Sequence, residues 1–267
     1  MTNVGRVGII GGAGWLGFAI AKALVNSGTV AAGELVCSYR SRKPQDTLGC
    51  MWTSDNRELV DRSDVIIVSV RPDDWMSVEA DAGGKLVISV MAGVPAADIK
   101  KRLGTARVAR ALPNAAAAIG FSYTPCFLQD PQASDVEIVS AIFRSCGEVD
   151  VVADERQIDY FTAMSGSGAA FPALLAESMM NDAIRRGIAP DIAMRAVQQV
   201  IIGAGRLQEA QRISPADTVK AFVDYRGTTA AGIEMMRERG FDQAVGAGLE
   251  AAYQRALALA GKDTKDR

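Results

Sequence analysis

Three glycines near the start of the chain have the spacing of a dinucleotide-binding turn. Gly12, Gly14 and Gly17 form the pattern Gly-x-Gly-x-x-Gly, after an apolar segment and before a segment with apolar residues at helical spacing. The pattern alone recurs by chance, but a buried strand before it and an amphipathic helix after it are the context in which it binds a cofactor. A pyrophosphate can then lie against the N-terminus of the helix. We therefore predict a dinucleotide site that includes Trp15 and Leu16, and a plain glycine-rich turn is the alternative.

The segment after the second predicted strand indicates which dinucleotide is bound. NAD sites carry an acidic residue about 20 residues after the glycine-rich turn, where it binds the ribose. Here residues 37–43 read Cys-Ser-Tyr-Arg-Ser-Arg-Lys, with no acid and three cations. Such a segment suits the 2′-phosphate of NADPH, although a solvated basic loop has the same composition. We predict NADPH as the cofactor, with Ser38, Arg40 and Ser41 among its contacts.

A second run of small polar residues lies nearer the C-terminus. Gly227, Thr228 and Thr229 stand at a predicted helix start, where free backbone N–H groups can hold a small anion. Together with a dinucleotide site, this run predicts a reductase for a small carboxylate. The chain has no histidine, which excludes Ser-His and Cys-His nucleophilic catalysis and any imidazole metal site.

The composition is that of a globular enzyme. The 267 residues suffice for one or two domains, with 49% hydrophobic and 22% charged residues. The formal net charge of −2 argues against a nucleic-acid partner, and no apolar run is long enough to span a membrane. The N-terminus lacks the layout of a secretory signal, and the four cysteines show no Cys-x-x-Cys pairing. We expect reduced cysteines, no bound metal and a cytoplasmic location.

Strands and helices alternate through the first half of the sequence. This alternation predicts a mostly parallel, doubly wound α/β sheet of the Rossmann type. After Val152 the strand signals end, and Asp154 with Gln157 resembles a capping box at the start of a helical region. We therefore predict a dinucleotide-binding domain over residues 1–153 and an all-helical substrate and dimerisation domain over residues 154–267.

The elements behind this prediction are short apolar runs and longer amphipathic ones. The predicted strands are Val4–Ile10, Leu35–Ser38, Val65–Val70, Leu86–Val90, Arg107–Ala111, Phe121–Phe127 and Glu148–Val152. In the first half the predicted helices are Gly14–Ser27, Pro72–Ala82 and Pro95–Leu103. In the second half they cover roughly 155–187, 190–212, 228–239 and 242–261, with a kink or interruption at Pro172 and a short helix from Ser214.

Seven segments stand in an order that is typical of one enzyme family. They are the glycine-rich turn, Asn56, Ser69-Val70-Arg71-Pro72, Met91-Ala92-Gly93, Leu112-Pro113-Asn114, Ser165-Gly166-Ser167-Gly168 and Arg226-Gly227-Thr228-Thr229-Ala230-Ala231-Gly232. In this order they resemble pyrroline-5-carboxylate reductase over nearly the full length. The resemblance implies further cofactor contacts from Asn56, Val70, Arg71, Pro72, Ala92, Gly93 and Asn114.

The resemblance also implies roles for the C-terminal run. Thr229 would hydrogen-bond the ring nitrogen of a cyclic imine and relay a proton, whereas a threonine that only caps a helix is the alternative. Gly227 and the N–H groups of Thr228 and Thr229 would hold the substrate carboxylate. The implied activity is NADPH-dependent reduction of a small cyclic imine carboxylate to the cyclic amino acid, either pyrroline-5-carboxylate to proline, a step of proline biosynthesis, or a related imine.

The sequence departs from the family just before the two threonines. The family's Ser-Pro-Gly-Gly is here Asp224-Tyr225-Arg226-Gly227, which adds two charges, a phenol and bulk. We predict that Arg226 pairs with a substrate carboxylate and Asp224 with a cationic nitrogen or a hydroxyl. Neutral drift in an ordinary family member is one alternative. The others are an imine reductase of secondary metabolism and a dinucleotide-binding homologue without catalysis.

The predicted helices of the second half are apolar over most of their circumference. Such helices must be covered on several sides. We therefore predict a homodimer through the helical domains, or a higher homo-oligomer of dimers, and the resemblance implies the same. The apolar positions are Phe171, Leu174, Leu175, Met179 and Ile184 on one helix and Val197, Val200, Ile201 and Ile202 on the next.

Overall fold

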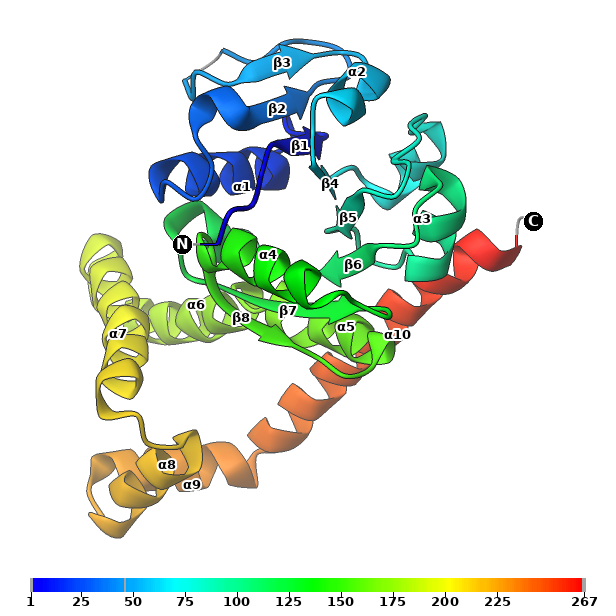
Figure 1. Cartoon of the computed structure of the whole chain (residues 1–267). Helices are drawn as coiled ribbons and strands as arrows, with labels where there is room; N and C mark the ends of the chain where they lie inside the picture. The colour runs from blue at the N-terminus through cyan, green and yellow to red at the C-terminus, as the bar shows by residue number, and fades with distance from the viewer. Residues whose placement is uncertain (1, 46, 266–267) are drawn as a thin grey trace. The chain divides into compact units, whose positions relative to one another are not determined.

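The computed structural model describes residues 2–45 and 47–265 (Figure 1). Its internal contacts divide the chain into two units, Met1–Ser167 together with Ala252–Arg267, and Gly168–Ala251. The division falls after the helix α5 (Glu155–Phe161), whereas the sequence places the domain boundary near Ala153. The boundary at Ala153 stays a prediction.

The first unit is built on one eight-stranded sheet in the order β3-β2-β1-β4-β5-β6-β7-β8. All neighbouring strands in it are parallel except β6 and β7. This arrangement confirms the predicted doubly wound sheet. The strands are β1 (Val7–Ile10), β2 (Leu35–Ser38), β3 (Met51–Thr53), β4 (Val65–Val68), β5 (Leu86–Ser89), β6 (Val108–Ala111), β7 (Ser122–Leu128) and β8 (Gly147–Val151).

The strand order creates a switch point beside β1. The chain leaves β1 for β2 and β3 on one side and then returns to β4 on the other side of β1. In open α/β sheets, ligands bind outside the carboxyl ends of the strands at such a point. The segments that follow β1, β2 and β4 are therefore expected to form the site.

Helices cover both faces of the sheet and enclose two apolar cores. One core joins β1 to α1 (Trp15–Asn26) and α4 (Ala133–Arg144), with Ile20 and Phe143 among its fully buried residues. The other core joins β4 and β5 to α2 (Asn56–Asp61) and α3 (Ala96–Leu103). Since both faces are covered, the central strands read as continuous apolar runs rather than alternating ones.

Several elements of this unit differ from the sequence-based prediction, and among them the short helix α2 was not predicted. The helix predicted over Pro72–Ala82 is a short 3-10 helix, η2 (Pro72–Ser77), because Ser77 Oγ donates to the Asp74 carbonyl oxygen and Val78 is already extended. The α4 helix was not predicted, although Gln132 and Asp135 form a capping box at its start. The three-residue edge strand β3 was also missed. Two further 3-10 helices are η1 (Ala32–Glu34) and η3 (Ala115–Ile119).

The helical region begins as predicted and then breaks earlier than predicted. Asp154 and Gln157 form the capping box of α5. A π-helical turn, η4 (Thr162–Gly166), separates α5 from α6 (Ala170–Arg185), so the predicted helix over 155–187 is two helices. Pro172 lies in the first turn of α6, where its missing N–H needs no partner, so the break comes just before it.

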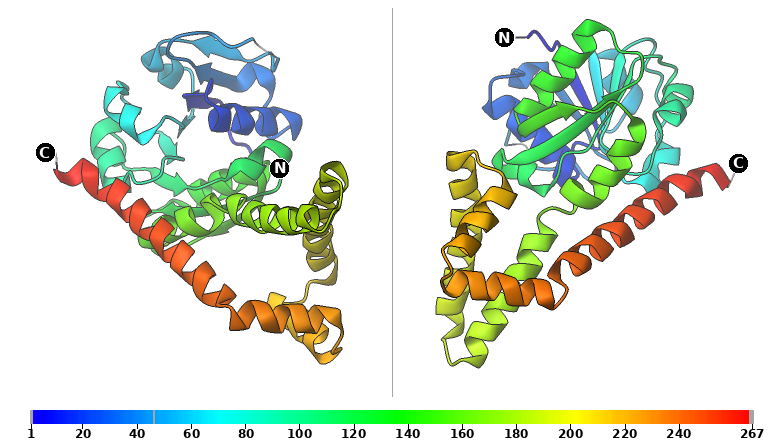
Figure 2. Two further views of the ribbon diagram at one scale, coloured as in Figure 1. Left: turned by 180° about the vertical axis from the view of Figure 1, so that it is seen from behind. Right: turned by 90° about the horizontal axis from the view of Figure 1, so that it is seen from below.

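The remaining helices follow one another without a strand between them in the described part of the chain (Figure 2). Ser214 caps α8 by accepting a hydrogen bond from the Asp217 N–H at 3.1 Å. Within the second unit α6 packs against α7, and α8 packs against α9. No helix among the described residues is long and apolar enough to cross a membrane. The helices are α7 (Pro190–Gln211), α8 (Pro215–Asp224), α9 (Thr228–Glu238) and α10 (Phe241–Lys265).

The second unit hides very little apolar surface within the chain. Of its residues Gly168–Ala251, all of which the structure describes, only Ala193, Val197 and Ala230 are buried. The α6 helix, described throughout, has no buried residue at all, and Leu174 on it is 61% exposed. Helices this apolar need cover from outside the chain.

Candidate functional site

The glycine-rich turn connects β1 to α1 by a short network of backbone hydrogen bonds. The N–H of Gly12 donates to the Ile9 carbonyl at 3.2 Å, and the N–H of Gly14 donates to the Gly11 carbonyl at 2.9 Å. Gly14 is the N-cap residue of α1, and no side chain among the described residues caps the helix. The first N–H groups of a helix without such a cap are free to bind an anion.

Close packing explains why glycine stands at these positions. A Cβ on Gly12 would lie 2.7 Å from the Cys37 Cβ on β2, and one on Gly17 would lie 2.6 Å from the Gly11 carbonyl oxygen. Gly11 has a φ of 81°, and a Cβ there would lie 2.5 Å from the Ser69 carbonyl oxygen. The turn therefore packs closely against β2, the start of α1 and Ser69 at the end of β4. Gly11 lies outside the predicted motif, although a fourth glycine, directly after the strand, is a sequence signal for such a position.

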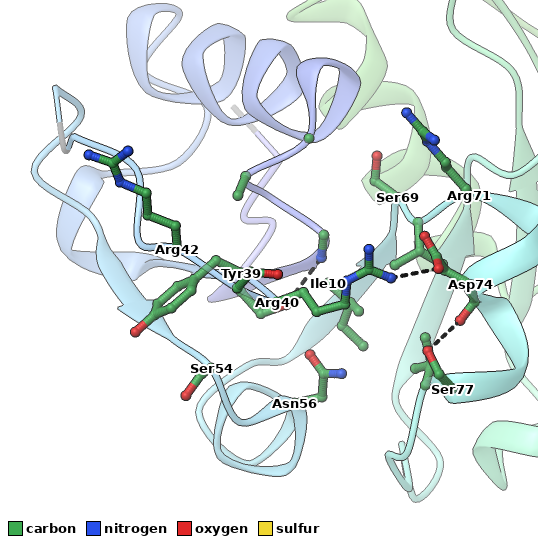
Figure 3. Close-up of a pocket in the computed structure, with 17 residues that line it drawn as sticks. Ile10, Tyr39, Arg40, Arg42, Ser54, Asn56, Ser69, Arg71, Asp74 and Ser77 are labelled. Carbon is green, nitrogen blue, oxygen red and sulfur yellow. Dashed lines mark hydrogen bonds and ion pairs between the residues drawn. The ribbon is translucent and has the colours of Figure 1, made fainter.

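A cavity of about 430 Å³ lies at the carboxyl ends of β1, β2 and β4 (Figure 3). Its volume is within the range of small-ligand and cofactor pockets. Seven of the predicted cofactor contacts line it, namely Gly14, Ser38, Arg40, Ser41, Asn56, Val70 and Arg71. Arg42, which belongs to the basic segment on which the NADPH prediction rests, also lines it. The lining residues that were not predicted as contacts are Ile10, Gly11, Ala13, Tyr39, Ser54, Ser69, Asp74, Ser77 and Val78.

The segment after β2 gives the cavity much of its positive charge. Arg40 and Arg42 are exposed and line the cavity, and Arg71 lines it from the end of β4. Arg40 Nη1 lies 2.6 Å from Asp74 Oδ1, so the ion pair joins two walls of the cavity (Figure 3). A cavity with three guanidinium groups and one carboxylate is suited to a phosphorylated ligand.

Ser38 is buried and supports the glycine turn. Its Oγ accepts a hydrogen bond from the Gly11 N–H at 3.1 Å, and its carbonyl oxygen accepts one from the Ala13 N–H at 3.2 Å. Ser38 thus fixes the turn to the end of β2. Its hydroxyl proton still has the freedom to point at a ligand.

Asn56 is placed by the cap of α2. It is the first residue of that helix, and the Asp55 carboxylate caps the helix by accepting the Arg57 N–H at 2.8 Å. The Asn56 amide lies beside the cavity (Figure 3).

The other predicted cofactor residues do not line the cavity. Trp15 at the start of α1 is 67% exposed, whereas Leu16 packs against the apolar core. Ala92 and Gly93, with a φ of 73° at Gly93, follow β5. Asn114 follows β6 and caps η3. Gly12 and Pro72 are adjacent in sequence to lining residues, and Gly17 packs against the lining residue Gly11, but none of the three lines the cavity.

Asn114 is held firmly at its position. Its Nδ2 donates to the Ser165 carbonyl at 3.0 Å, and its Oδ1 accepts the Ala116 N–H at 2.9 Å. Its own N–H donates to Ser122 Oγ at 2.9 Å. A hydrogen bond therefore joins two of the family-like segments, Leu112-Pro113-Asn114 and Ser165-Gly166-Ser167-Gly168.

The second predicted anion-binding helix start, here called the α9 cradle, lies in the second unit, Gly168–Ala251, which is entirely helical apart from its loops and is called the helical unit below. Gly227 is the N-cap residue of α9, Thr228 and Thr229 begin the helix, and no described side chain caps it. Gly227 is extended, with a φ of −90°, but a Cβ there would lie 3.2 Å from the Tyr225 ring. The predicted helix start is confirmed, and its N–H groups carry the same anion-binding potential as those of α1.

The rewritten segment before this cradle contains an unusual backbone. Arg226 has a φ of 54°, a left-handed conformation that glycine adopts without strain and arginine does not. Asp224 Oδ2 lies 2.5 Å from Lys220 Nζ, one turn earlier on α8. The Asp224 carboxylate therefore has a cationic partner within its own helix. Tyr225 is 85% exposed.

The polar groups of the site are those of a dinucleotide pocket rather than a metal centre. Among residues 2–45 and 47–265, no group of histidine, cysteine, aspartate and glutamate side chains could hold a metal ion. The groups that line the cavity are hydroxyls, an amide, guanidinium groups and one carboxylate.

Two family models match the chain, one on each side of the predicted boundary. Residues 6–93 match the family described as NADP oxidoreductase coenzyme F420-dependent, and residues 155–259 match pyrroline-5-carboxylate reductase dimerisation. The glycine turn and the basic cavity fall within the first match, and the α9 cradle falls within the second.

Whole-chain relatives agree with both matches. The chain is 31% identical to the pyrroline-5-carboxylate reductase of Synechocystis over 96% of this chain and 99% of that protein. It is 27% identical to pyrroline-5-carboxylate reductase 3 of Rattus norvegicus over 98% of each chain. A solved pyrroline-5-carboxylate reductase from Coxiella burnetii superposes with a TM-score of 0.89 at 26% identity, over 97% of this chain and 99% of that one.

The whole-chain matches cover 96% to 98% of this chain, and together with the family models they confirm the predicted family, fold and cofactor. The glycine cradle that a Cβ would fill fits a pyrophosphate, and the arginine-rich cavity beside it fits NADPH. The chain belongs to the pyrroline-5-carboxylate reductase family and is an NADPH-dependent oxidoreductase that acts on a C=N bond.

Proposed function

We propose that this chain reduces pyrroline-5-carboxylate to proline with NADPH. The observation that carries the proposal is the basic cavity beside a glycine turn whose helix has no side-chain cap among the described residues. The names of the relatives supply the substrate, a cyclic imine carboxylate. When bound, NADPH is the source of the two electrons that reduce the carbon of the C=N bond.

The cofactor is held by backbone groups on one side and cations on the other. Gly12, Gly14 and Gly17, with the N–H groups of Trp15 and Leu16, receive the pyrophosphate at the start of α1. Arg40, Ser41 and Ser38 receive the 2′-phosphate. We assign the remaining predicted contacts, which follow β3, β4, β5 and β6, to the rest of the cofactor: Asn56, Val70, Arg71, Pro72, Ala92, Gly93 and Asn114.

The assignment of Arg40 is tested by the relative affinity for the two nicotinamide cofactors. Arg40→Gln should weaken NADPH about tenfold or more and leave NADH nearly unchanged, because a charge-assisted contact to the phosphate is lost. Arg57→Gln is the matched control, since Arg57 is also exposed and paired with an acid but does not line the cavity. An equal loss for both cofactors would contradict the assignment.

The substrate chemistry does not require a histidine. A cyclic imine bound as its iminium needs no obligatory proton transfer at the carbon that is reduced, so positioning and electrostatics suffice. The N–H groups of Gly227, Thr228 and Thr229 at the start of α9 would hold the carboxylate. The Thr229 hydroxyl would hydrogen-bond the ring nitrogen and relay its proton.

The role of Thr229 is tested with two variants of similar size. Thr229→Val should lower kcat about 10- to 100-fold, whereas Thr229→Ser, which keeps the hydroxyl, should remain near the wild type. Thermal melting checks that both variants fold. A valine variant with the kcat of the wild type would show that Thr229 only begins the helix.

The identity of the substrate is tested by steady-state rates on a panel of five- and six-membered cyclic imino acids. The proposal expects pyrroline-5-carboxylate to be the best substrate. Tight binding of NADPH with no oxidation across the panel would instead favour a homologue without catalysis.

A second candidate function is the reduction of a different or decorated imine. The observation that favours it is the left-handed backbone of Arg226, where the family pattern has glycine. A strained residue that is retained in a substrate loop points to a function for its side chain. The Asp224 carboxylate is paired with Lys220, whereas Arg226 has a positive charge that could bind an anionic group on the substrate other than the carboxylate held at the start of α9.

Arg226→Gly separates the two candidates. If the loop is tuned to another imine, the change should shift the ratio of kcat/KM between two imines by about ten to a hundred and fifty, the scale of one lost polar contact. Arg212→Gly is the matched control, because Arg212 is also left-handed, with a φ of 52°, and lies at the end of α7. An unchanged ratio would leave pyrroline-5-carboxylate reduction as the better reading.

The helical unit belongs to a homo-oligomer, and we propose that its core is a homodimer. The exposed apolar side chains of α6 and α7 support this, as does the match to a dimerisation family. Leu174→Glu should convert the dimer to monomers in light scattering at micromolar concentration, because the charge would be buried at the interface. A wild-type monomer under the same conditions would contradict the proposal.

We also propose a reducing compartment such as the cytoplasm. All four cysteines are buried thiols that form no disulfide. Disulfides form and persist in oxidising compartments, so reduced cysteines are typical of a protein in a reducing one. A fusion to a fluorescent protein, imaged in the host cell, tests this location.

A further inference from the structure

One acidic side chain lies in an otherwise basic cavity. Among the described residues that line it, Asp74 is the only acid, and Arg40, Arg42 and Arg71 line the same cavity. Asp74 Oδ1 lies 2.6 Å from Arg40 Nη1, across a separation of 34 residues. Neither the glycine turn nor the proposed chemistry gives this carboxylate a role.

The position of Asp74 is fixed by its own element. Its N–H donates to the Arg71 carbonyl at 2.9 Å, and its carbonyl accepts Ser77 Oγ at 2.7 Å. The next residue, Trp75, is 1% exposed, and the Arg102 guanidinium lies 5.5 Å from the centre of its ring. The η2 helix is therefore anchored to the core, and the carboxylate at its start is held at the cavity wall.

Arg40, by contrast, stands on an exposed loop. Its side chain is 75% exposed in the ion pair, against 37% for Asp74. In the free protein, the fixed Asp74 carboxylate therefore determines the position of the Arg40 guanidinium. A phosphate that binds Arg40 must either take the guanidinium from Asp74 or share it, and in both cases it meets a second negative charge nearby.

We propose that Asp74 is a specificity residue that limits the preference for the 2′-phosphorylated cofactor. It does so by engaging Arg40 in the free protein and by opposing the charge of the 2′-phosphate. This inference rests on the proposed contact between Arg40 and that phosphate. Removing the charge of Asp74 tightens binding of ligands that carry the 2′-phosphate and leaves ligands without it unchanged.

The experiment compares two fragments that differ only in the 2′-phosphate. Isothermal titration calorimetry on the full chain measures Kd for adenosine 2′,5′-bisphosphate and for adenosine 5′-monophosphate. The variants are Asp74→Asn and, as a matched control, Asp73→Asn. Asp73 is the adjacent exposed acid on η2 and does not line the cavity. Thermal melting confirms that each variant is folded.

The ratio compared is the affinity for adenosine 2′,5′-bisphosphate divided by the affinity for adenosine 5′-monophosphate. We expect Asp74→Asn to raise this ratio about three- to fivefold, which is the scale of one exposed ion pair. The rise should come from the bisphosphate alone and should shrink as salt is added, since screening weakens both effects of the carboxylate. Asp73→Asn should leave the ratio unchanged. A ratio that stays constant or falls in Asp74→Asn, or an equal rise in Asp73→Asn, overturns the inference.

A third variant separates this inference from the proposed function. If Arg40→Gln lowers the ratio while Asp74→Asn fails to raise it, Arg40 binds the 2′-phosphate and only the role of Asp74 is wrong. If Arg40→Gln leaves the ratio unchanged, the proposed phosphate contact is wrong, and the inference falls with it.

Discussion

Replacing Gly17 by alanine is a direct test of how the glycine turn holds the cofactor. Gly17 is the third residue of α1, and a Cβ there would lie 2.6 Å from the Gly11 carbonyl oxygen and 3.0 Å from the Gly12 Cα. Both neighbours are backbone atoms, so no side-chain rotation can relieve the contact. The start of α1 and the turn must move apart by about half an ångström or more to restore a normal contact distance.

The cost to folding should be small. Overpacking a well-packed site costs about 1–3 kcal/mol, and alanine regains about 1 kcal/mol over glycine inside a helix. The net loss of about 0–2 kcal/mol leaves the protein folded. The displaced N–H groups are the ones that would bind the pyrophosphate, and each charge-assisted hydrogen bond contributes about 1.5–3 kcal/mol. Weakening two of them predicts a loss of about 100-fold in the affinity for NADP+.

Two measurements on the same preparation check this prediction. Guanidinium chloride unfolding gives the free energy of unfolding, and titration calorimetry gives Kd for NADP+. Gly33→Ala is the control, because Gly33 lies in η1 and a methyl group there would have open space, with no described atom beyond its chain neighbours within 4 Å. A folded Gly17→Ala protein that binds NADP+ as tightly as the wild type would refute the reasoning.

Three further predictions concern stability and thiol reactivity. Arg110 is 2% exposed and pairs with two carboxylates of α5, so Arg110→Met should cost about 3–5 kcal/mol in denaturant unfolding, whereas Arg62→Met in an exposed helical pair should cost less than about 1 kcal/mol. Hydrogen bonds from Arg6 hold the pKa of Asp64 below its ordinary value of 3.8, so Asp64→Asn should be less stable than the wild type at neutral pH, and the difference should vanish as the pH falls through that lowered pKa. Burial raises the pKa of Cys126, and all four cysteines are buried, so Ellman's reagent should label none of them at about pH 8 until the protein is unfolded. Equal losses for the two arginine variants, a stability difference for Asp64→Asn that persists in acid, or rapid labelling of the native protein would contradict these expectations in turn.

The sheet and the glycine turn could be predicted because their causes are local in the sequence. A parallel strand covered on both faces must be apolar throughout, and the runs at β1, β4 and β5 show this directly. The tight packing of Gly12 and Gly17 leaves no room for a side chain, so their spacing is fixed by the fold. Short runs carry less information, which is why the three residues of β3 were missed.

The wall of the cavity opposite β2 could not be predicted. Its shape depends on η2, where a buried tryptophan and a side-chain hydrogen bond hold a 3-10 turn in place of the expected α-helix. The partner of Arg40 comes from this turn, 34 residues away, and no local pattern links the two. Pairing across strand ends is a property of the folded sheet, so the basic loop could be recognised in the sequence and its carboxylate could not.

In the helical unit, the helix starts depend on nearby residues in the sequence, whereas the contacts of the helices depend on residues far away. The caps at Ser214 and Gly227 and the proline at the start of α7 explain where the helices begin, and each is readable from a few residues. No side chain of α6 is buried within the described part of the chain, although the helix packs against α7, and in the proposed homodimer the second copy would cover its apolar side chains. Changes in the glycine turn should therefore act on cofactor binding at any protein concentration. Changes on α6 should act through assembly, and their effect on activity should depend on protein concentration.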